Sequence, residues 1–417
     1  MKTSIFTPYG SITKAKGLTV HVSGLLLAVG DICVVDSVNH KTDAEVIGID
    51  GVESILMVYD NIGKVSVGSI VYKKSFANSY DYCDEYLGNV LDCFGESDTC
   101  HVSQNARPLS ARKLKFSDRA SVSEPLDVGI AAINGLLTLG KGQRVGVMAG
   151  SGVGKSVLQT MIAKNTQADI CVCALIGERS REVIDFVEKT LTEETRRKTI
   201  VVSAPADSSP MKKLRAGEYA VRIAEKYAEE GKDVVLLFDS LTRYAHALRE
   251  VGLAAGEPPT SKGYPPSVFT KLPQLVERSG NTKNGSISSV YTVLMDGDDE
   301  NDPVVDSARA ILDGHIMLSR KLASQGHYPA IDITKSVSRC MADLVDEQTL
   351  HKVHTVKRWL SLYAENEEFL AMGAYQPGGR PDLDEAIRKV DAVKNMVCQR
   401  PTDVRNMNLS RQYLYSL

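Results

Sequence analysis

The chain has 417 residues, of which 43% are hydrophobic and 24% are charged, and its formal net charge is −3. Disorder of the whole chain is excluded, because disordered chains hold fewer apolar residues and carry more net charge. The near balance of 49 basic and 52 acidic residues argues against a protein whose whole surface binds nucleic acid or anionic lipid. At roughly 150 residues per domain, the length predicts two to three domains.

No signal peptide or membrane span is predicted. The first 17 residues lack an apolar core, and no stretch approaches the roughly 18 apolar residues of a membrane helix. The eight cysteines include no CxxC pair, so a zinc ribbon or thioredoxin-like motif is not indicated. Cys171 and Cys173 alternate with Val172, and we expect them to be buried free thiols on one face of a strand. A cytoplasmic protein that docks on membranes through partners is expected.

Residues 1–72 predict a small β-barrel or sandwich. Runs rich in β-branched residues recur at about ten-residue spacing, separated by Gly, Asp and Asn. The segment has five Lys, no Arg and seven acidic residues, a net charge of −2. Because nucleic-acid-binding barrels are usually basic, this charge does not favour RNA or DNA as a partner. The expected strands are 18–22, 31–35, 45–49 and 54–58.

The middle of the chain predicts an α/β domain. Residues 73–140 are irregular, but from 141 to 335 apolar strand runs alternate with helical stretches such as 182–191 and 211–229. This alternation is typical of a parallel sheet covered by helices on both faces. The expected strands are 144–148, 170–176, 200–202, 234–238 and 288–294. Residues 344–417 predict helices at 346–363 and 382–398, with a break at 376–381.

A glycine-rich loop, AGSGVGKS, follows the first of these strands and precedes the helical run 157–163. Its glycines let backbone N–H groups converge on phosphate oxygens, and the helix N-terminus adds a favourable dipole. Lys155 is expected to neutralise the β- and γ-phosphates of ATP, and Ser156 to ligate Mg²⁺. Ala149 stands where the strict pattern has its first glycine. The predicted nucleotide-binding residues are Gly150, Ser151, Gly152, Val153, Gly154, Lys155, Ser156 and Val157.

Two acidic residues end neighbouring strands of the predicted sheet. Asp239 follows the apolar run 234–238 and is expected to hold Mg²⁺ through water, although it could also cap the next helix. Glu178 follows the strand 170–176, at the edge where ligands of open α/β sheets bind. A carboxylate there can polarise the water that attacks the γ-phosphate. Arg179 beside it could reach that phosphate; the alternative is that this charged turn is solvated.

Several motifs occur in one order: AGSGVGKS, GERSREV, VVLLFDSLTRYA, GEPPTSKGYPPSVF, GHYPAID and SVSR. Together they resemble the export ATPases of type III secretion systems, a family related to the catalytic subunits of rotary ATP synthases. The resemblance runs from about residue 10 to the end, and the stretches 257–262 and 302–315 look more like the flagellar branch. It implies a RecA-like P-loop core (73–343) between a small N-terminal β-barrel (1–72) and a C-terminal helical domain (344–417).

The resemblance also implies further site residues. Arg339, in SVSR, resembles an arginine finger that reaches the nucleotide of the neighbouring subunit; otherwise it forms a structural salt bridge. Tyr328 matches an aromatic residue that packs against adenine; otherwise it is ordinary core. Glu182 and Arg243 match positions near the water shell of Mg²⁺. Non-catalytic subunits of rotary ATPases lack the equivalent of Glu178, so its presence implies an active enzyme.

The implied function is a homohexameric, Mg²⁺-dependent ATP hydrolase that energises flagellar protein export and helps to release chaperones and unfold substrates. The implied partners are a stator-like regulatory protein, a central stalk protein, an export gate at the inner membrane, chaperones and export substrates, with no nucleic acid. The enzyme would be cytoplasmic and peripherally associated with the inner membrane.

The chain departs from the family pattern at a few positions. Ala131 and Asn134 stand where Arg and Asp are usual, and Ser180 replaces a common Gly. Compared with the family, the N-terminus looks short by roughly 20 residues. In the family that extension helps to bind a stator-like regulatory partner and promotes assembly, so how this chain binds such a partner is left open.

Four alternatives remain open: an injectisome ATPase, a catalytic subunit of a rotary ATP synthase or vacuolar-type pump, an RNA-translocating hexamer, and an inactive scaffold. The acidic N-terminal domain and the lack of an aromatic RNA-binding signature weigh against the RNA motor.

Overall fold

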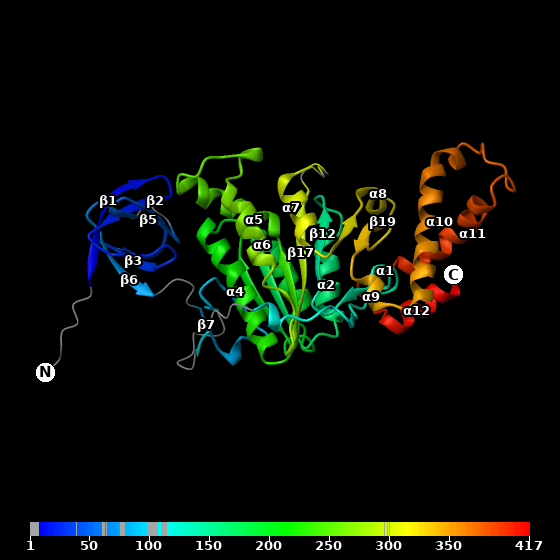
Figure 1. The fold of residues 1–417 in the computed structure, drawn as a ribbon, viewed down its shortest axis with the longest axis horizontal. Coiled ribbons are helices and arrows are strands. Elements are labelled where there is room, and N and C mark those ends of the chain that lie inside the picture. The colour runs from blue at the N-terminus through cyan, green and yellow to red at the C-terminus, as the bar shows by residue number, and fades with distance from the viewer. Residues whose placement is uncertain are drawn as a thin grey trace.

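The structure, a computed structural model, describes residues 8–417 apart from positions 39, 61–62, 64, 76–79, 98–106, 110–114, 296, 298 and 300. Figure 1 shows a β-barrel at one end of an elongated molecule, an α/β layer in the middle and a group of helices at the other end. This arrangement confirms the predicted fold class of a P-loop α/β core with an N-terminal barrel and a C-terminal helical part.

The N-terminal barrel closes because its first strand pairs on both sides. Its strands follow the order β1-β2-β5-β4-β3-β6, and β1 pairs with β6 through Tyr9 opposite Tyr72. Alternate side chains such as Val20, Val22 and Leu56 point inward and form one apolar core. The strands are β1 (Tyr9–Lys16), β2 (Thr19–Ser23), β3 (Ile32–Ser37), β4 (His40–Asp50), β5 (Glu53–Val58) and β6 (Ile70–Ser75).

The central sheet has the order β19-β18-β12-β17-β15-β13-β14-β8, and its long strands are parallel except for β19 against β18. Its strands are β8 (Val90–Leu91), β12 (Arg144–Ala149), β13 (Ile170–Ile176), β14 (Thr199–Ala204), β15 (Asp233–Asp239), β17 (Ser286–Leu294), β18 (Gly314–Leu318) and β19 (Ile331–Ser338), with β16 (Gly280–Asn281) antiparallel to β17. Two short pairs lie outside it: β7 (Asp81–Tyr82) with β9 (Arg107–Pro108), and β10 (Pro125–Leu126) with β11 (Leu139–Gly140).

Helices cover both faces of this sheet, and alternate residues of β13 divide between two apolar clusters. Val172 and Ala174 pack in the first cluster, with α4 (Pro210–Glu229), α5 (Leu241–Ala254), α6 (Pro266–Val276) and α7 (Pro303–Ile311). Cys171 and Cys173 pack in the second, with α1 (Ala131–Leu136), α2 (Lys155–Asn165) and α3 (Ser180–Thr190). Both thiols are buried and free, as expected; Cys100 lies outside the described residues.

The C-terminal helices pack on each other and on α1. They are α10 (Glu347–Ala371), α11 (Pro381–Val397) and α12 (Met407–Ser416), preceded by the short α8 (Arg320–Ser324) and α9 (Met341–Leu344). Asn134 helps to join them to the core, because its Nδ2 donates to Asp127 Oδ1 at 2.7 Å and to the carbonyl oxygen of Arg405 at 3.0 Å. Among the described residues, no helix combines the length and apolar character needed to cross a membrane.

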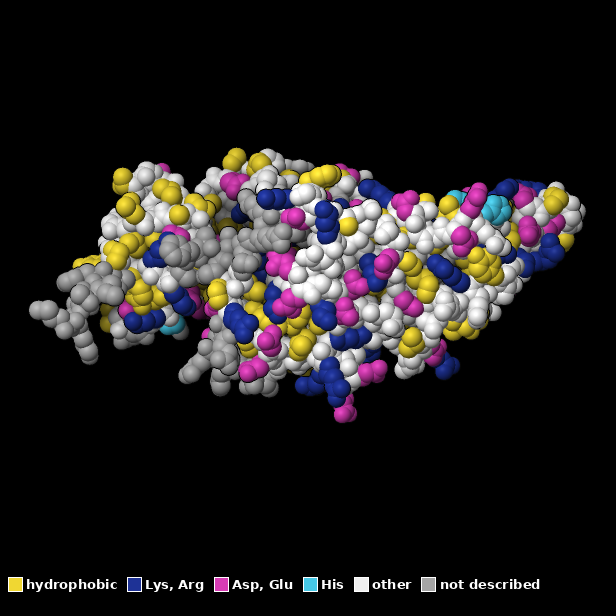
Figure 2. All heavy atoms as spheres, turned by 60° about the horizontal axis from the view of Figure 1, so that its bottom comes forward, with side chains coloured by type: hydrophobic (Ala, Val, Ile, Leu, Met, Phe, Trp, Pro, Cys, Tyr) yellow, Lys and Arg dark blue, Asp and Glu magenta, His cyan; other side chains and the backbone are white. Residues whose placement is uncertain are grey.

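The surface carries charges of both signs. On the face drawn in Figure 2, Lys and Arg side chains are interspersed with Asp and Glu over the core. This mixture fits the near-neutral composition. The prediction that nucleic acid is not a partner stays a prediction.

Candidate functional site

The glycine-rich loop joins the end of β12 to the start of α2 at the carboxyl edge of the parallel sheet. Gly152 and Gly154 have φ angles of +77° and +96°, a region that side chains with a Cβ rarely adopt. Val153 is buried and anchors the loop, whereas Ser151, Gly152, Ser156 and Val157 are exposed. The backbone of the loop is therefore free to approach a phosphate group.

The side chain of Lys155, at the end of this loop, contacts two carboxylates. Its Nζ lies 2.6 Å from Asp239 Oδ1 and 3.1 Å from Glu178 Oε1. Asp239 ends β15 and Glu178 follows the adjacent strand β13, so the sheet itself brings them together. The three side chains are only 4–11% exposed. The structure thus brings these three predicted site residues into contact; their roles in the reaction stay predictions.

Burial and attraction set the protonation of this cluster. Burial raises the pKa of the Asp239 carboxyl and Glu178 acts in the same direction, while Lys155 and Thr292 oppose them. Burial alone would lower the pKa of the Lys155 ammonium, but the charges of Asp239 and Glu178 outweigh it and the pKa is raised. Lys155 therefore keeps the positive charge that a phosphate ligand needs.

Arg243 approaches the same carboxylate from α5. Its Nε lies 3.5 Å from Glu178 Oε1. Gly177, with φ +77°, allows this approach, since a Cβ there would lie 2.5 Å from Arg243 Cδ. Arg179 and Glu182 lie further out: their side chains are 80% and 45% exposed and 3.6 Å apart.

Tyr328 and Arg339 flank opposite ends of β19. A Cβ on Gly154 would lie 3.5 Å from two ring carbons of Tyr328, so this half-exposed ring borders the phosphate loop. Arg339 is exposed and its Nη2 donates to the carbonyl oxygen of Arg309 at 3.1 Å. Between them β19 has eight residues, a span of about 26 Å. Arg339 therefore lies at the sheet edge opposite its own phosphate loop.

The residues at the site fit a hard divalent cation. The hydroxyl of Ser156 and the carboxylate of Asp239 offer the oxygen ligands that Mg²⁺ prefers. In the described part of the chain, no three acidic, His or Cys side chains gather into a complete metal cage.

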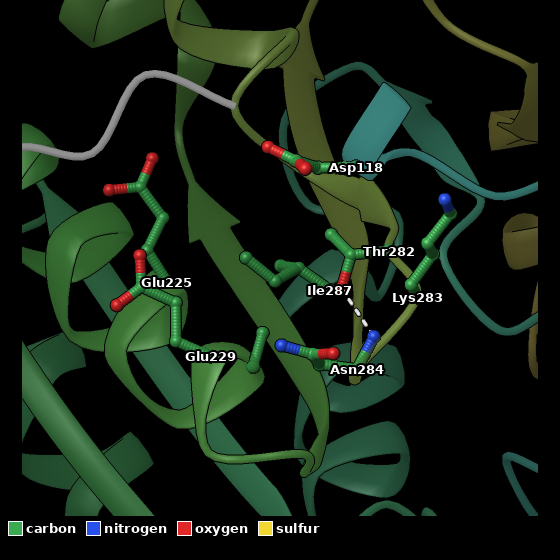
Figure 3. A pocket seen from close by; sticks show the side chains of 8 residues that line it. Asp118, Glu225, Glu229, Thr282, Lys283, Asn284 and Ile287 are labelled. Atoms are coloured by element: carbon green, nitrogen blue, oxygen red, sulfur yellow. Dashed lines mark hydrogen bonds between the residues drawn. The ribbon is translucent and has the colours of Figure 1, made fainter. Parts of the chain in front are cut away.

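A separate pocket of about 130 Å³ lies at the amino edge of the sheet, beside the start of β17 and the end of α4 (Figure 3). Its Thr282 Oγ1 accepts a hydrogen bond from the backbone N–H of Asn284 at 3.3 Å. The phosphate loop lies at the other edge, so this pocket is not part of the nucleotide site. It is lined by Asp118, Glu225, Ala228, Glu229, Thr282, Lys283, Asn284 and Ile287.

Two residues that touch the site were not predicted. Thr292 Oγ1 lies 2.6 Å from Asp239 Oδ1, but a threonine within a strand is too common to signal a role. The backbone N–H of Gln399 donates to the carbonyl oxygen of Tyr328 at 2.9 Å. No local sequence pattern indicates a contact between positions so far apart.

A phosphate loop between strand and helix, with two buried carboxylates from adjacent strands meeting its lysine, defines the nucleotide-binding core of a P-loop ATPase. Comparison with protein families agrees. Residues 129–338 match the ATP synthase alpha/beta family, nucleotide-binding domain, and residues 345–416 match the T3SS EscN ATPase C-terminal domain. The chain belongs to the ATP synthase alpha/beta family, and within it to the type III secretion ATPases.

Individual relatives extend over nearly the whole chain. The flagellum-specific ATP synthase of Pseudomonas aeruginosa is 44% identical over 98% of this chain and 92% of the relative. The flagellum-specific ATP synthase of Salmonella typhimurium is 45% identical over 91% of this chain and 87% of the relative. The solved structure of the assembled ATPase EscN of enteropathogenic E. coli superposes with a TM-score of 0.91 at 36% identity, covering 98% of this chain and 99% of that one. The predicted family and the predicted ATPase activity are confirmed.

Proposed function

We propose that the protein is a Mg²⁺-dependent ATP hydrolase that drives type III protein export, in the flagellar branch. The main support is that Lys155 contacts both Glu178 and Asp239 next to an exposed phosphate loop. The flagellar assignment rests on the curated relatives, which are named flagellum-specific ATP synthases.

Lys155 and Glu178 have separate tasks in the proposed reaction. Lys155 leaves the two carboxylates for the β- and γ-phosphates of ATP. Glu178 then orients a water molecule that attacks the γ-phosphorus in line: the new P–O bond forms, the bond to the β-phosphate oxygen breaks, and the water proton passes toward Glu178. Arg243 at 3.5 Å steadies the Glu178 carboxylate.

The remaining predicted site residues act around this step. When bound, Mg²⁺ would neutralise phosphate charge, held by Ser156 and, through water, by Asp239 and Glu182, with Arg243 near its water shell. Arg179 turns inward to the γ-phosphate, and Tyr328 packs on adenine. The backbone of the loop from Gly150 to Val157 binds the phosphates.

Arg339 completes the site of a neighbouring subunit. Its place at the opposite sheet edge supports this, since it cannot reach its own phosphate loop. A finger supplied in trans needs a head-to-tail interface, and such an interface closes into a ring. We therefore propose a homohexamer, consistent with the assembled state named for EscN.

Further partners follow from the relatives. The EscN structure with its central stalk EscO supports a central stalk protein as a partner of this chain. We extend the proposal to a stator-like regulator, an export gate at the inner membrane, chaperones and export substrates, which places the enzyme peripherally at the inner membrane. The division at residues 72 and 343 is kept as a proposed domain map.

The proposal is tested on the purified protein. Light scattering measures its mass, and phosphate release measures hydrolysis, each with and without Mg²⁺ and ATP and with Lys155→Ala as the inactive control. A ring of one chain type that hydrolyses ATP is expected. Activity that appears only with a second, non-catalytic subunit would indicate a rotary synthase instead, and strong stimulation by RNA would indicate a nucleic-acid motor.

A further inference from the structure

Thr292 lies on β17, the strand between β12, which leads into the phosphate loop, and β15, which ends at Asp239. The residue is fully buried, and Thr292 pairs with Val147 of β12. A β-branched side chain held by strands on both sides has little rotamer freedom, so its hydroxyl has a fixed position.

The hydroxyl has one proton and two acceptors within reach. Asp239 Oδ1 lies at 2.6 Å, and the carbonyl oxygen of Phe238 lies at 3.3 Å. A carboxylate is a stronger acceptor than a peptide carbonyl, and the shorter distance belongs to it. The proton therefore goes to Asp239.

This hydrogen bond fixes how the carboxylate is turned. Lys155 Nζ and Thr292 Oγ1 both bind Oδ1 of Asp239, each at 2.6 Å. Among the described residues, both hydrogen bonds to this carboxylate end on Oδ1 and none reaches Oδ2. When ATP draws Lys155 away to its phosphates, Thr292 is the donor that remains on Oδ1, and the orientation of Asp239 then depends on it.

We propose that Thr292 is a positioning residue that holds Asp239 in the orientation needed for Mg²⁺·ATP once Lys155 has left it. The inference rests on the proposed role of Asp239. It adds a residue that acts through Asp239 and touches neither the nucleotide nor the metal ion itself.

The test removes the hydroxyl of Thr292 while keeping the shape of its side chain. Thr292→Val removes the donor but retains the branched side chain, and Thr292→Ser retains the donor. ATP binding is measured at a series of Mg²⁺ concentrations with a fluorescent ATP analogue, alongside kcat and KM. For Thr292→Val, the Mg²⁺ concentration at half-maximal binding should rise about tenfold, because hydrogen bonds to charged groups are among the stronger ones. Binding without Mg²⁺ should hardly change, and Thr292→Ser should restore the wild-type Mg²⁺ dependence.

Unchanged Mg²⁺ dependence in Thr292→Val would overturn the inference, as would equal losses in the Val and Ser variants when both melt at the wild-type temperature. If the Val variant does not fold, Thr292→Ala and Thr292→Ser are compared in the same assay, and equal Mg²⁺ dependence in these two would overturn it.

A third variant separates this inference from the proposed function. Asp239→Asn should itself weaken Mg²⁺-dependent binding, and adding Thr292→Val to it should cost nothing more. Normal binding in Asp239→Asn would overturn the role of Asp239. A further loss in the double variant would overturn only the inference about Thr292.

Discussion

Lys155 Nζ lies 2.6 Å from Asp239 Oδ1, so the cation that is expected to bind phosphate is already paired with a carboxylate. Glu178 holds the same ammonium at 3.1 Å. An incoming triphosphate must therefore displace two buried carboxylates, and it must leave each of them with another cation or donor. The nucleotide and its metal ion would thus rearrange the whole cluster together, with Arg243 remaining as a partner of Glu178.

Glu178→Gln should bind ATP and fail to hydrolyse it. The amide keeps the size of the side chain but cannot take a proton from water, and losing a general base costs about 10²- to 10⁴-fold in rate. ATP binding and phosphate release are measured on the same preparation. Glu188→Gln, an exposed change on α3, the helix that begins just after Glu178, serves as the matched control. Rapid turnover by Glu178→Gln would contradict the assignment.

Arg339→Ala should be inactive alone and partly active when mixed with a Lys155→Ala chain. In mixed rings, some interfaces combine an intact Lys155 with an intact Arg339 from the neighbour. An arginine finger contributes about 10³- to 10⁵-fold, so even a small share of intact interfaces is detectable by phosphate release. Each variant alone is the control. No recovery at any mixing ratio, with mixed rings verified by mass, would argue against a finger in trans.

Tyr328→Ala should raise KM for ATP by between about twofold and tenfold, the range for loss of an aromatic stacking contact. Tyr328→Phe keeps the ring and should stay near wild type. Inhibition by inorganic triphosphate, which has no base, should be the same in all three proteins. If Tyr328→Ala weakened triphosphate binding as much as ATP binding, the ring would support the loop next to Gly154 rather than bind adenine.

Glu45 predicts a pH dependence of stability. It reaches from β4 toward a cavity of about 120 Å³ lined also by Arg215, Glu218 and Lys271. Burial raises its pKa to about 7; a hydrogen bond from Tyr59 lowers it, Glu218 raises it, and Arg215 and Lys271 lower it. The folded chain then holds this proton more tightly than the unfolded chain, so stability should fall as pH rises from about 4.5 through about 7 and then level off.

The variant Glu45→Gln isolates this effect. It cannot ionise but can still accept the hydrogen bond from Tyr59. Its melting temperature should exceed that of the wild type at pH 8, and the difference should shrink toward pH 5. Glu53→Gln, on the neighbouring strand β5 and part-exposed, is the comparison. A constant difference across this pH range would contradict the prediction.

The strands that the sequence predicts well are those buried on both faces. The run 170–176 coincides with β13, in which every residue is buried. The strand β1 was not predicted, because most of its side chains are exposed, and β19, in which exposed and buried side chains do not alternate regularly, was missed as well; both strands carry Lys, Ser and Thr. They form strands because β1 pairs with β2 and β6 in the barrel and β19 pairs with β18 at the sheet edge. Pairing with distant segments leaves no pattern in the local sequence.

In the site, too, the features with a local sequence pattern were predictable and the contacts between distant segments were not. Lys155, Glu178 and Asp239 were predictable, because a loop motif and the ends of parallel strands place them at one edge. The tie between Gln399 and Tyr328, and that between Asn134 and Arg405, join distant segments. Asn134 could be noted only as a departure from a family pattern; the structure gives it hydrogen bonds to Asp127 and Arg405.

Closure of the N-terminal barrel would restrict how subunits of the proposed ring join at that end. Because β1 pairs with both β2 and β6, the described strands form a closed barrel with no free β-edge onto which another chain could add a strand. Any contact between barrels must therefore be made by side chains and turns. Such contacts can slide or separate without breaking a hydrogen-bonded ladder, so subunits could be added or exchanged one at a time while each barrel stays folded.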